Sequence, residues 1–150
     1  MYRDDPDVCA RSPRARALIV DHDQAVAEFL TECLHQAGFE AVDWTGDGRE
    51  GVEMYRALRP DVVLLDADMP AMDGSTNDST NGSMNGYDSC RRIKAADPAA
   101  TVFLLTADPS HAVAQQALAD GCAAGLLAKP FSIQKLFEMV DRYVHLEVPL

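Results

Sequence analysis

Four side chains with chemical potential each follow directly on a short apolar run of the sequence. They are two carboxylates, a hydroxyl and an ammonium group: Asp21 after residues 17–20, Asp66 after residues 62–65, Thr106 after residues 101–105, and Lys129 after residues 125–128. If these runs are parallel strands of one sheet, their carboxyl ends lie at a common edge, where open α/β sheets bind ligands. We therefore expect the four groups to converge on one site.

This set of groups suits phosphoryl chemistry. Clustered carboxylates repel one another unless a cation joins them, and a hard ion such as Mg²⁺ prefers oxygen ligands. Mg²⁺ together with a lysine is what a phosphoryl group needs, and a carboxylate can act as the nucleophile and form an aspartyl phosphate. Each residue alone also fits a helix cap, a turn or a surface charge. Their occurrence at four strand ends favours the phosphoryl site.

The strand that ends at Asp66 is the clearest element of the sequence. Residues 62–65 are Val-Val-Leu-Leu, without polar alternation, which is typical of a central parallel strand that is covered on both faces. The other strands are predicted at residues 17–20, 39–44 (an edge strand), 101–105 and 125–128.

Helical spacing of apolar residues follows each strand. It predicts helices around residues 25–37, 52–58, 87–97, 110–121 and 132–144. Asp23, Ser110 and Ser132 are the candidate N-caps, and Gly38 ends the first helix. Five strands that alternate with five helices indicate an α/β fold with a doubly wound five-stranded parallel sheet and right-handed crossovers.

Two segments do not fit this alternation. Residues 1–15 are polar and contain two prolines, and we expect a disordered arm. Within residues 67–86, Met72-Asp73-Gly74 is echoed by Met84-Asn85-Gly86, and Ser, Thr, Asn and Gly dominate between the two copies. This low-complexity composition predicts a flexible insert at about residues 75–86.

Composition limits the possible functions. The net charge of −11 belongs to the folded part, because the three arginines and three aspartates of residues 1–15 cancel. This acidic balance argues against direct nucleic-acid binding and is compatible with a cation site. The four cysteines form no CxxC pair and are expected to be free, buried thiols. We find no signal peptide and no apolar run of membrane-spanning length, so we expect a cytoplasmic protein without a membrane partner.

The strand-end motifs together resemble the receiver domain of two-component response regulators. Residues 66–74, Asp-Ala-Asp-Met-Pro-Ala-Met-Asp-Gly, look like the phosphoacceptor signature of that family. Its other motifs are matched in order by Val20-Asp21, Thr106-Ala107 and Lys129-Pro130-Phe131. The resemblance covers about residues 16–147. It implies a flavodoxin-like three-layer sandwich with strand order 2-1-3-4-5 and a cis bond between Lys129 and Pro130.

The resemblance also implies a function. Asp66 would accept a phosphoryl group from a histidine kinase or a histidine phosphotransfer protein in a Mg²⁺-dependent reaction, and the domain would relay a conformational signal. Thr106 and Lys129 would contact the phosphoryl oxygens, while Asp21, Asp66 and the backbone carbonyl of Asp68 would hold the ion. Such a domain is a regulatory phosphoacceptor rather than an enzyme, with intrinsic autodephosphorylation at most.

Further partners implied by the resemblance are an output domain, fused or separate, and a second copy of the chain in a homodimer. The last predicted helix runs almost to residue 150, so we expect no effector domain within this sequence.

Three features depart from the family pattern. His22 stands where the family places a second metal-binding acid, Leu126 stands at the aromatic switch position, and the insert lies beside the site. Imidazole is a poor Mg²⁺ ligand, so we expect weakened Mg²⁺ binding and better tolerance of Mn²⁺. We also expect the coupling through the fourth helix and fifth strand to be weak or differently built. The register of the insert is ambiguous, although Met72-Asp73-Gly74 has the family distance from Asp66.

Two alternative functions remain open. His22 and Leu126 are compatible with a pseudo-receiver, a binding module that is never phosphorylated. Asp66-Ala67-Asp68 also echoes the DxD motif of haloacid-dehalogenase-type phosphatases, with Asp66 as nucleophile and Asp68 as acid. In that family, however, the motif closes the first strand of a larger domain.

Overall fold

The polypeptide forms one sheet of five parallel strands in the order β2-β1-β3-β4-β5. The computed structural model describes residues 15–69 and 85–143. The strands are β1 (Arg16–Val20), β2 (Ala41–Thr45), β3 (Val62–Asp66), β4 (Val102–Thr106) and β5 (Gly125–Ala128). The helices are α1 (Gln24–Ala37), α2 (Gly48–Leu58), α3 (Asn85–Ala96), α4 (Ala112–Asp120) and α5 (Ile133–Tyr143). The predicted fold class and strand order are confirmed.

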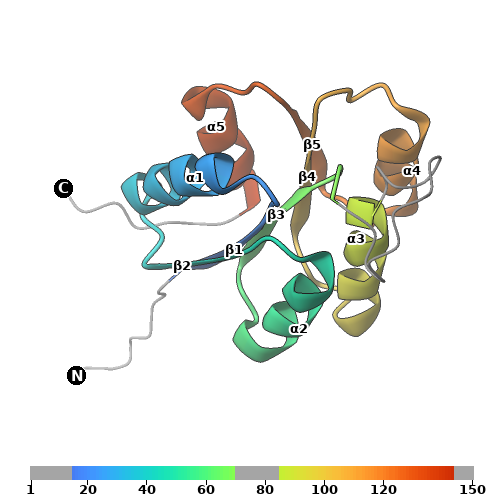
Figure 1. Ribbon diagram of the computed structural model, residues 1–150, viewed down its shortest axis with the longest axis horizontal. Helices are drawn as coiled ribbons and strands as arrows, with labels where there is room; N and C mark the ends of the chain where they lie inside the picture. The colour runs from blue at the N-terminus through green and yellow to red at the C-terminus, as the bar shows by residue number, and fades with distance from the viewer. Residues whose placement is uncertain (1–14, 70–84, 144–150) are drawn as a thin grey trace.

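Helices cover both faces of the sheet, with α1 and α5 on one face and α2, α3 and α4 on the other (Figure 1). Alternate residues of each central strand point to opposite layers. Leu64 packs with the apolar side chains of α1 and α5, whereas Leu65 packs with those of α2 and α3. All five residues of β3 and all five of β4 are buried. Burial on both faces is the physical reason why these strands lack polar alternation.

Local hydrogen bonds set most helix ends as predicted. Asp23 caps α1, because its Oδ1 accepts from the backbone N–H of Ala25 at 3.0 Å, and Gly38 ends the helix in the left-handed region with φ 114°. Ser132 Oγ accepts from the N–H of Lys135 at 3.1 Å at the start of α5.

The prediction that Ser110 caps α4 is wrong. The N-cap is His111, whose Nδ1 accepts from the backbone N–H of Val113 at 3.2 Å. Ser110 instead belongs to the preceding turn, where its hydroxyl donates to Asp108 Oδ1 at 2.6 Å. The competing bond to the aspartate in the turn explains why this serine does not cap the helix.

The end of the predicted arm and the end of the predicted insert both fall within the described residues. Ala15, assigned to the arm, is buried, and its carbonyl accepts from the N–H of Glu40 at 2.9 Å. Helix α3 begins at Asn85, so it includes the last two residues assigned to the insert. The rest of the predicted arm and of the insert, and residues 144–147, lie outside the described residues.

Three of the four cysteines lie within the described residues. Cys33 and Cys90 are buried free thiols, as predicted, while the free thiol of Cys122 is half-buried and Cys9 lies outside the described residues. Among the helices that are described, none combines the length and apolar character needed to cross a membrane.

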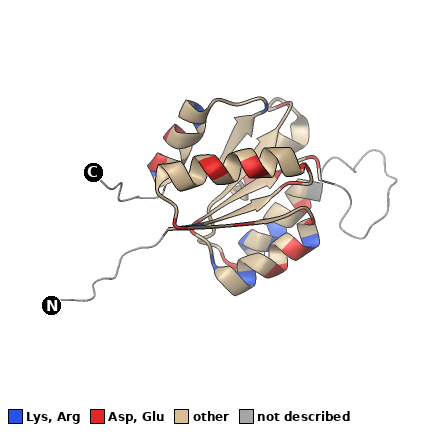
Figure 2. Ribbon diagram, turned by 60° about the vertical axis from the view of Figure 1, so that its left-hand side comes forward, with Lys and Arg blue, Asp and Glu red and all other residues tan. Residues whose placement is uncertain are grey.

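Charge is unevenly distributed over the helices (Figure 2). Helix α1 carries two glutamates and neither lysine nor arginine, whereas α2 and α3 together carry five basic residues and three acidic ones. The acidic excess of the chain is therefore not carried by the face that α2 and α3 form.

One buried tyrosine ties α2 to the end of α3. The Tyr55 hydroxyl donates to Asp97 Oδ2 at 2.7 Å, and Arg59 donates to the same oxygen at 3.1 Å. The hydrogen bond from Tyr55, with help from the N–H of Ala99 and from Arg59, holds the pKa of Asp97 below its ordinary value. The tie therefore depends on an ionised Asp97.

We predict that Tyr55→Phe lowers the melting temperature by about 2–4 °C near neutral pH, because the buried hydrogen bond is lost. The pKa of Asp97 is lower in the folded chain than in the unfolded chain, so its stabilisation is complete above about pH 3.9 and is lost as pH falls through the folded value. The difference between wild type and variant should therefore shrink in acid, as followed by circular dichroism.

Tyr143→Phe is the matched control. Its hydroxyl donates to the backbone carbonyl of Ala124 at 3.2 Å and to no carboxylate in the described structure. Its effect should not change between neutral and acidic pH. A Tyr55→Phe effect that stays constant or grows in acid would contradict the prediction.

Candidate functional site

The carboxyl ends of β1, β3, β4 and β5 bring the four predicted side chains to one edge of the sheet. Asp21 directly follows β1, Asp66 ends β3, Thr106 ends β4 and Lys129 directly follows β5. The residues Asp21 and Asp66 are 0% exposed and Thr106 is 4% exposed. Strand ends in register therefore gather two buried carboxylates, a hydroxyl and an ammonium group.

The Lys129 ammonium lies between the two carboxylates. Its Nζ is 3.2 Å from Asp21 Oδ2 and 3.3 Å from Asp66 Oδ1. Burial disfavours the charged ammonium, but attraction to Asp66 and Asp21 outweighs burial and raises the pKa of Lys129. Burial, followed by repulsion from Asp66, raises the pKa of Asp21 against the opposing effect of its hydrogen bonds. The site is therefore built to hold positive charge.

Backbone N–H groups orient three of these side chains. The N–H of Asp23 donates to Asp21 Oδ1 at 2.8 Å, that of Asp68 to Asp66 Oδ1 at 3.0 Å, and that of Asp108 to Thr106 Oγ at 3.0 Å. In each case the donor is two residues further along the chain, as in Asx and ST turns. Because the Thr106 oxygen accepts this bond, its own proton remains available for another acceptor.

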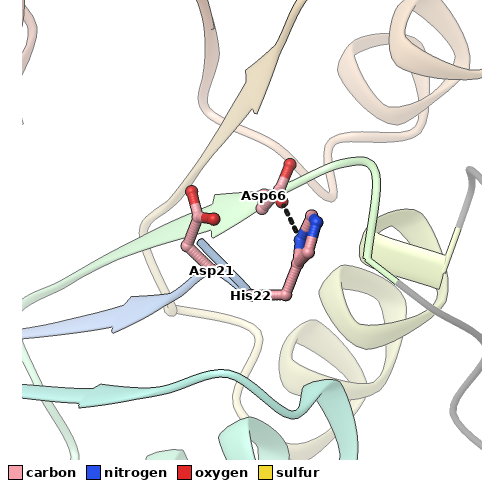
Figure 3. A group of neighbouring side chains, drawn as sticks. All are labelled: Asp21, His22 and Asp66. Atoms are coloured by element: carbon pink, nitrogen blue, oxygen red, sulfur yellow. Dashed lines mark hydrogen bonds and ion pairs between the residues drawn. The ribbon is translucent and has the colours of Figure 1, made fainter. Parts of the chain in front are cut away.

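His22 reaches into the site from the loop after β1 (Figure 3). Its Nδ1 lies 2.9 Å from Asp66 Oδ2, and its side chain is 50% exposed. Asp21, His22 and Asp66 each offer a ligand atom, and these atoms lie within 4.8 Å of one another. Two carboxylates and one imidazole at this spacing fit a divalent cation, with His22 as the nitrogen donor.

Asp68 stands apart from this group. Within the described structure, its carboxylate is not among the converging ligand atoms. Partial burial and repulsion from Asp66 raise the pKa of Asp68. The predicted role of its backbone carbonyl as a ligand remains a prediction.

Two predicted features of β5 and its loop can be compared with the structure. The Lys129–Pro130 bond is cis, as predicted. Leu126 is half-buried and packs on the core formed with α2 and α3. Its expected effect on coupling remains a prediction.

The start of α3 lies against the backbone of Asp66, a contact that was not predicted. A Cβ atom on Gly86 would be 2.2 Å from the Asp66 carbonyl oxygen and 2.5 Å from Ala67 Cα. Only glycine permits this close approach. The repeated Met84-Asn85-Gly86 was the signal in the sequence, but it was assigned to the insert.

Two further residues near the site were also missed. The indole N–H of Trp44, the single tryptophan of the chain, donates to the Asp21 backbone carbonyl at 2.8 Å. His111 lines a hollow of about 80 Å³ together with Asp68 and Thr106. Neither position had a sequence signal, because each contact depends on how separate loops approach one another.

Comparison with known proteins identifies the family. The model of the response regulator receiver domain matches residues 17–141. The chain belongs to this family. Receiver domains are regulatory phosphoacceptors of two-component signalling and bind Mg²⁺ at an acidic site, and the match leaves the phosphatase alternative without support.

Relatives of this receiver domain differ in length. It is 31% identical over 127 residues to the chemotaxis protein CheY of Thermotoga maritima, covering 85% of this chain and 95% of that protein. It is 35% identical to the DNA-binding response regulator MtrA of Mycolicibacterium paratuberculosis, covering 85% of this chain but only 50% of MtrA. The solved CheX–CheY–BeF3–Mg²⁺ complex of Borrelia burgdorferi matches with a TM-score of 0.70 and 27% identity, covering 87% of this chain and 90% of that chain.

We predict that Gly86→Ala destabilises the receiver domain by about 1–3 kcal/mol, because the added methyl group overlaps the backbone at the end of β3. Gly46→Ala is the control, since its Cβ would lie 3.5 Å from the nearest atom, the Cα of His22, which is ordinary contact. It should change the free energy of unfolding by less than about 0.5 kcal/mol. Urea denaturation measures both, and equal effects would show that α3 does not need glycine here.

Proposed function

We propose that Asp66 is the residue of this receiver domain that accepts the phosphoryl group. The observation that carries the proposal is its buried carboxylate at the end of a central strand, held 3.3 Å from the Lys129 ammonium. A carboxylate in this setting is a fixed nucleophile beside a fixed positive charge.

Asp66, Lys129 and Thr106 have different roles in the transfer. An oxygen of Asp66 attacks the phosphorus atom, a new P–O bond forms, and the bond from phosphorus to the donor breaks with its electron pair leaving on the donor. The Lys129 ammonium, which contacts the two carboxylates in the structure, then contacts the phosphoryl oxygens instead. The Thr106 hydroxyl donates a hydrogen bond to one of these oxygens.

We assign the metal site of the domain to Asp21, His22 and Asp66, with the backbone carbonyl of Asp68 as a further ligand. Mg²⁺, when bound there, supplies positive charge that neutralises the oxygens of the transferring phosphoryl group. The converging ligand atoms and the net negative charge of two carboxylates against one ammonium support this assignment.

The donor we propose is a histidine kinase or a histidine phosphotransfer protein, the class of partner that receiver domains use. The chain spans half the length of MtrA, a DNA-binding regulator. We therefore propose that its output passes through a further domain, fused or separate. A homodimer and a cytoplasmic location remain predictions.

Incubation with Mg²⁺ and acetyl phosphate tests the assignment of Asp66. Intact-mass spectrometry should show the gain of one phosphoryl group, which hydroxylamine removes, and peptide mapping after borohydride reduction should place it on Asp66. Asp68→Asn is the matched control, because it removes the neighbouring carboxylate and should still be labelled.

Asp66→Asn should abolish the labelling. Labelling that persists in Asp66→Asn and disappears in Asp68→Asn would move the acceptor to Asp68. Failure of the wild type with every phosphodonor and divalent ion would favour the pseudo-receiver alternative.

Lys129→Met should slow phosphorylation by acetyl phosphate about 10²–10³-fold, the usual effect of removing one group that stabilises developing charge. Lys135→Met removes the same charge from α5, where the side chain is exposed, and should leave the rate unchanged. The rate of mass gain measures both variants, and circular dichroism confirms that each is folded. Similar rates in the two variants would remove Lys129 from the proposed role.

A further inference from the structure

The loop after β1 supplies a nitrogen ligand where a receiver site of this kind would be expected to use oxygen. His22 Nδ1 lies 2.9 Å from Asp66 Oδ2, and Figure 3 shows the ring directed at that carboxylate. Its ligand atom also lies within 4.8 Å of a carboxylate oxygen of Asp21. The imidazole therefore lies within reach of any ion that both carboxylates hold.

The other nearby acid is committed elsewhere. Asp23 Oδ1 accepts from the backbone N–H groups of Ala25 at 3.0 Å and Val26 at 3.4 Å, which caps α1. A move of Asp23 into the site would leave these helix N–H groups without their cap, at a cost of about 1 kcal/mol. His22 is thus the side chain of this loop that can complete the ligand set.

We propose that His22 is a metal ligand and makes the site selective for divalent transition-metal ions, with Mn²⁺ as the probe, over Mg²⁺. The proposal rests on the proposed function, since it concerns the ion site beside Asp66. Mg²⁺ requires hard oxygen ligands in a near-octahedral shell, whereas imidazole nitrogen suits the later first-row ions such as Fe²⁺, Ni²⁺ and Zn²⁺. Mn²⁺ also takes oxygen ligands, but it accepts nitrogen more readily than Mg²⁺ does.

The charge of the site also favours transition-metal ions over Mg²⁺. The Lys129 ammonium offsets one of the two buried carboxylates, and a neutral imidazole adds no negative charge. Mg²⁺ binding depends mainly on electrostatic attraction to oxygen, so it loses most from the missing carboxylate. A transition-metal ion recovers part of that loss through its bond to nitrogen.

Trp44 provides a readout that needs no phosphodonor. Its indole N–H donates to the Asp21 backbone carbonyl at 2.8 Å, and it is the single tryptophan of the chain. An ion held by Asp21 should therefore change the tryptophan fluorescence. Titrations of tag-free protein with Mg²⁺ and with Mn²⁺ then give two dissociation constants for each variant.

His22→Asp should tighten Mg²⁺ binding and lower the preference for Mn²⁺ over Mg²⁺ about tenfold or more, as expected when a group that tunes a metal is replaced. His22→Ala should weaken Mn²⁺ binding by a larger factor than Mg²⁺ binding. His35→Asp is the matched control: it makes the same change in the last turn of α1, where His35 Nδ1 lies 3.1 Å from the Phe39 carbonyl oxygen, and it lies outside the converging ligand group of the described residues. Its preference should equal that of the wild type.

Pulsed EPR of bound Mn²⁺ provides the direct test. The wild type should show coupling to ¹⁴N of an imidazole, and His22→Asp should lose it. An unchanged preference in His22→Asp, or a wild-type spectrum without nitrogen coupling, would overturn the proposal. Neither measurement uses phosphorylation, so loss of metal selectivity with intact Asp66 labelling separates this inference from the proposed function.

Discussion

The contact of Lys129 with two buried carboxylates is the constraint on which the rest of the site depends. Asp21 and Asp66 are both 0% exposed, and two carboxylates held this close without a cation would repel each other at low dielectric. The pair is kept together because β1 and β3 are hydrogen-bonded neighbours in the sheet. The fold thus supplies the free energy that holds like charges together, and the ammonium offsets part of it.

The contacts of Lys129 link the charge at the two carboxylates to strands β4 and β5. In the proposed function, a cation or a phosphoryl group would change what the ammonium of Lys129 contacts. Lys129 follows β5, and Thr106 ends the adjacent strand β4. The backbone N–H of Lys129 also donates to the Thr106 carbonyl at 2.8 Å. A rearrangement of Lys129 or Thr106 would therefore act first on β4 and β5, whose loops lead into α4 and α5.

Sequence patterns predicted the fold because its main determinants are local or periodic. The apolar run before Asp66 identified a strand buried on both faces, and Asp23 and Gly38 identified the ends of α1. The convergence at the sheet edge followed from parallel topology alone. The cap of α4 was mispredicted because Ser110 bonds to Asp108 in the preceding turn, and His111, one residue further on, caps the helix instead. The contacts of Trp44 and Gly86 were missed because they join segments that are distant along the chain.

The close approach of α3 to the end of β3 has a consequence for the length of the chain between them. Gly86 rests on the backbone of Asp66 and Ala67, so the first residues of α3 lie beside the end of β3 although about twenty positions separate them in the sequence. The entropic cost of closing such a loop rises by only about 0.6 kcal/mol for each doubling of its length. A longer segment here therefore adds little to the free energy cost of folding, and a protein engineer can use the same point to graft a peptide epitope or a reporter domain.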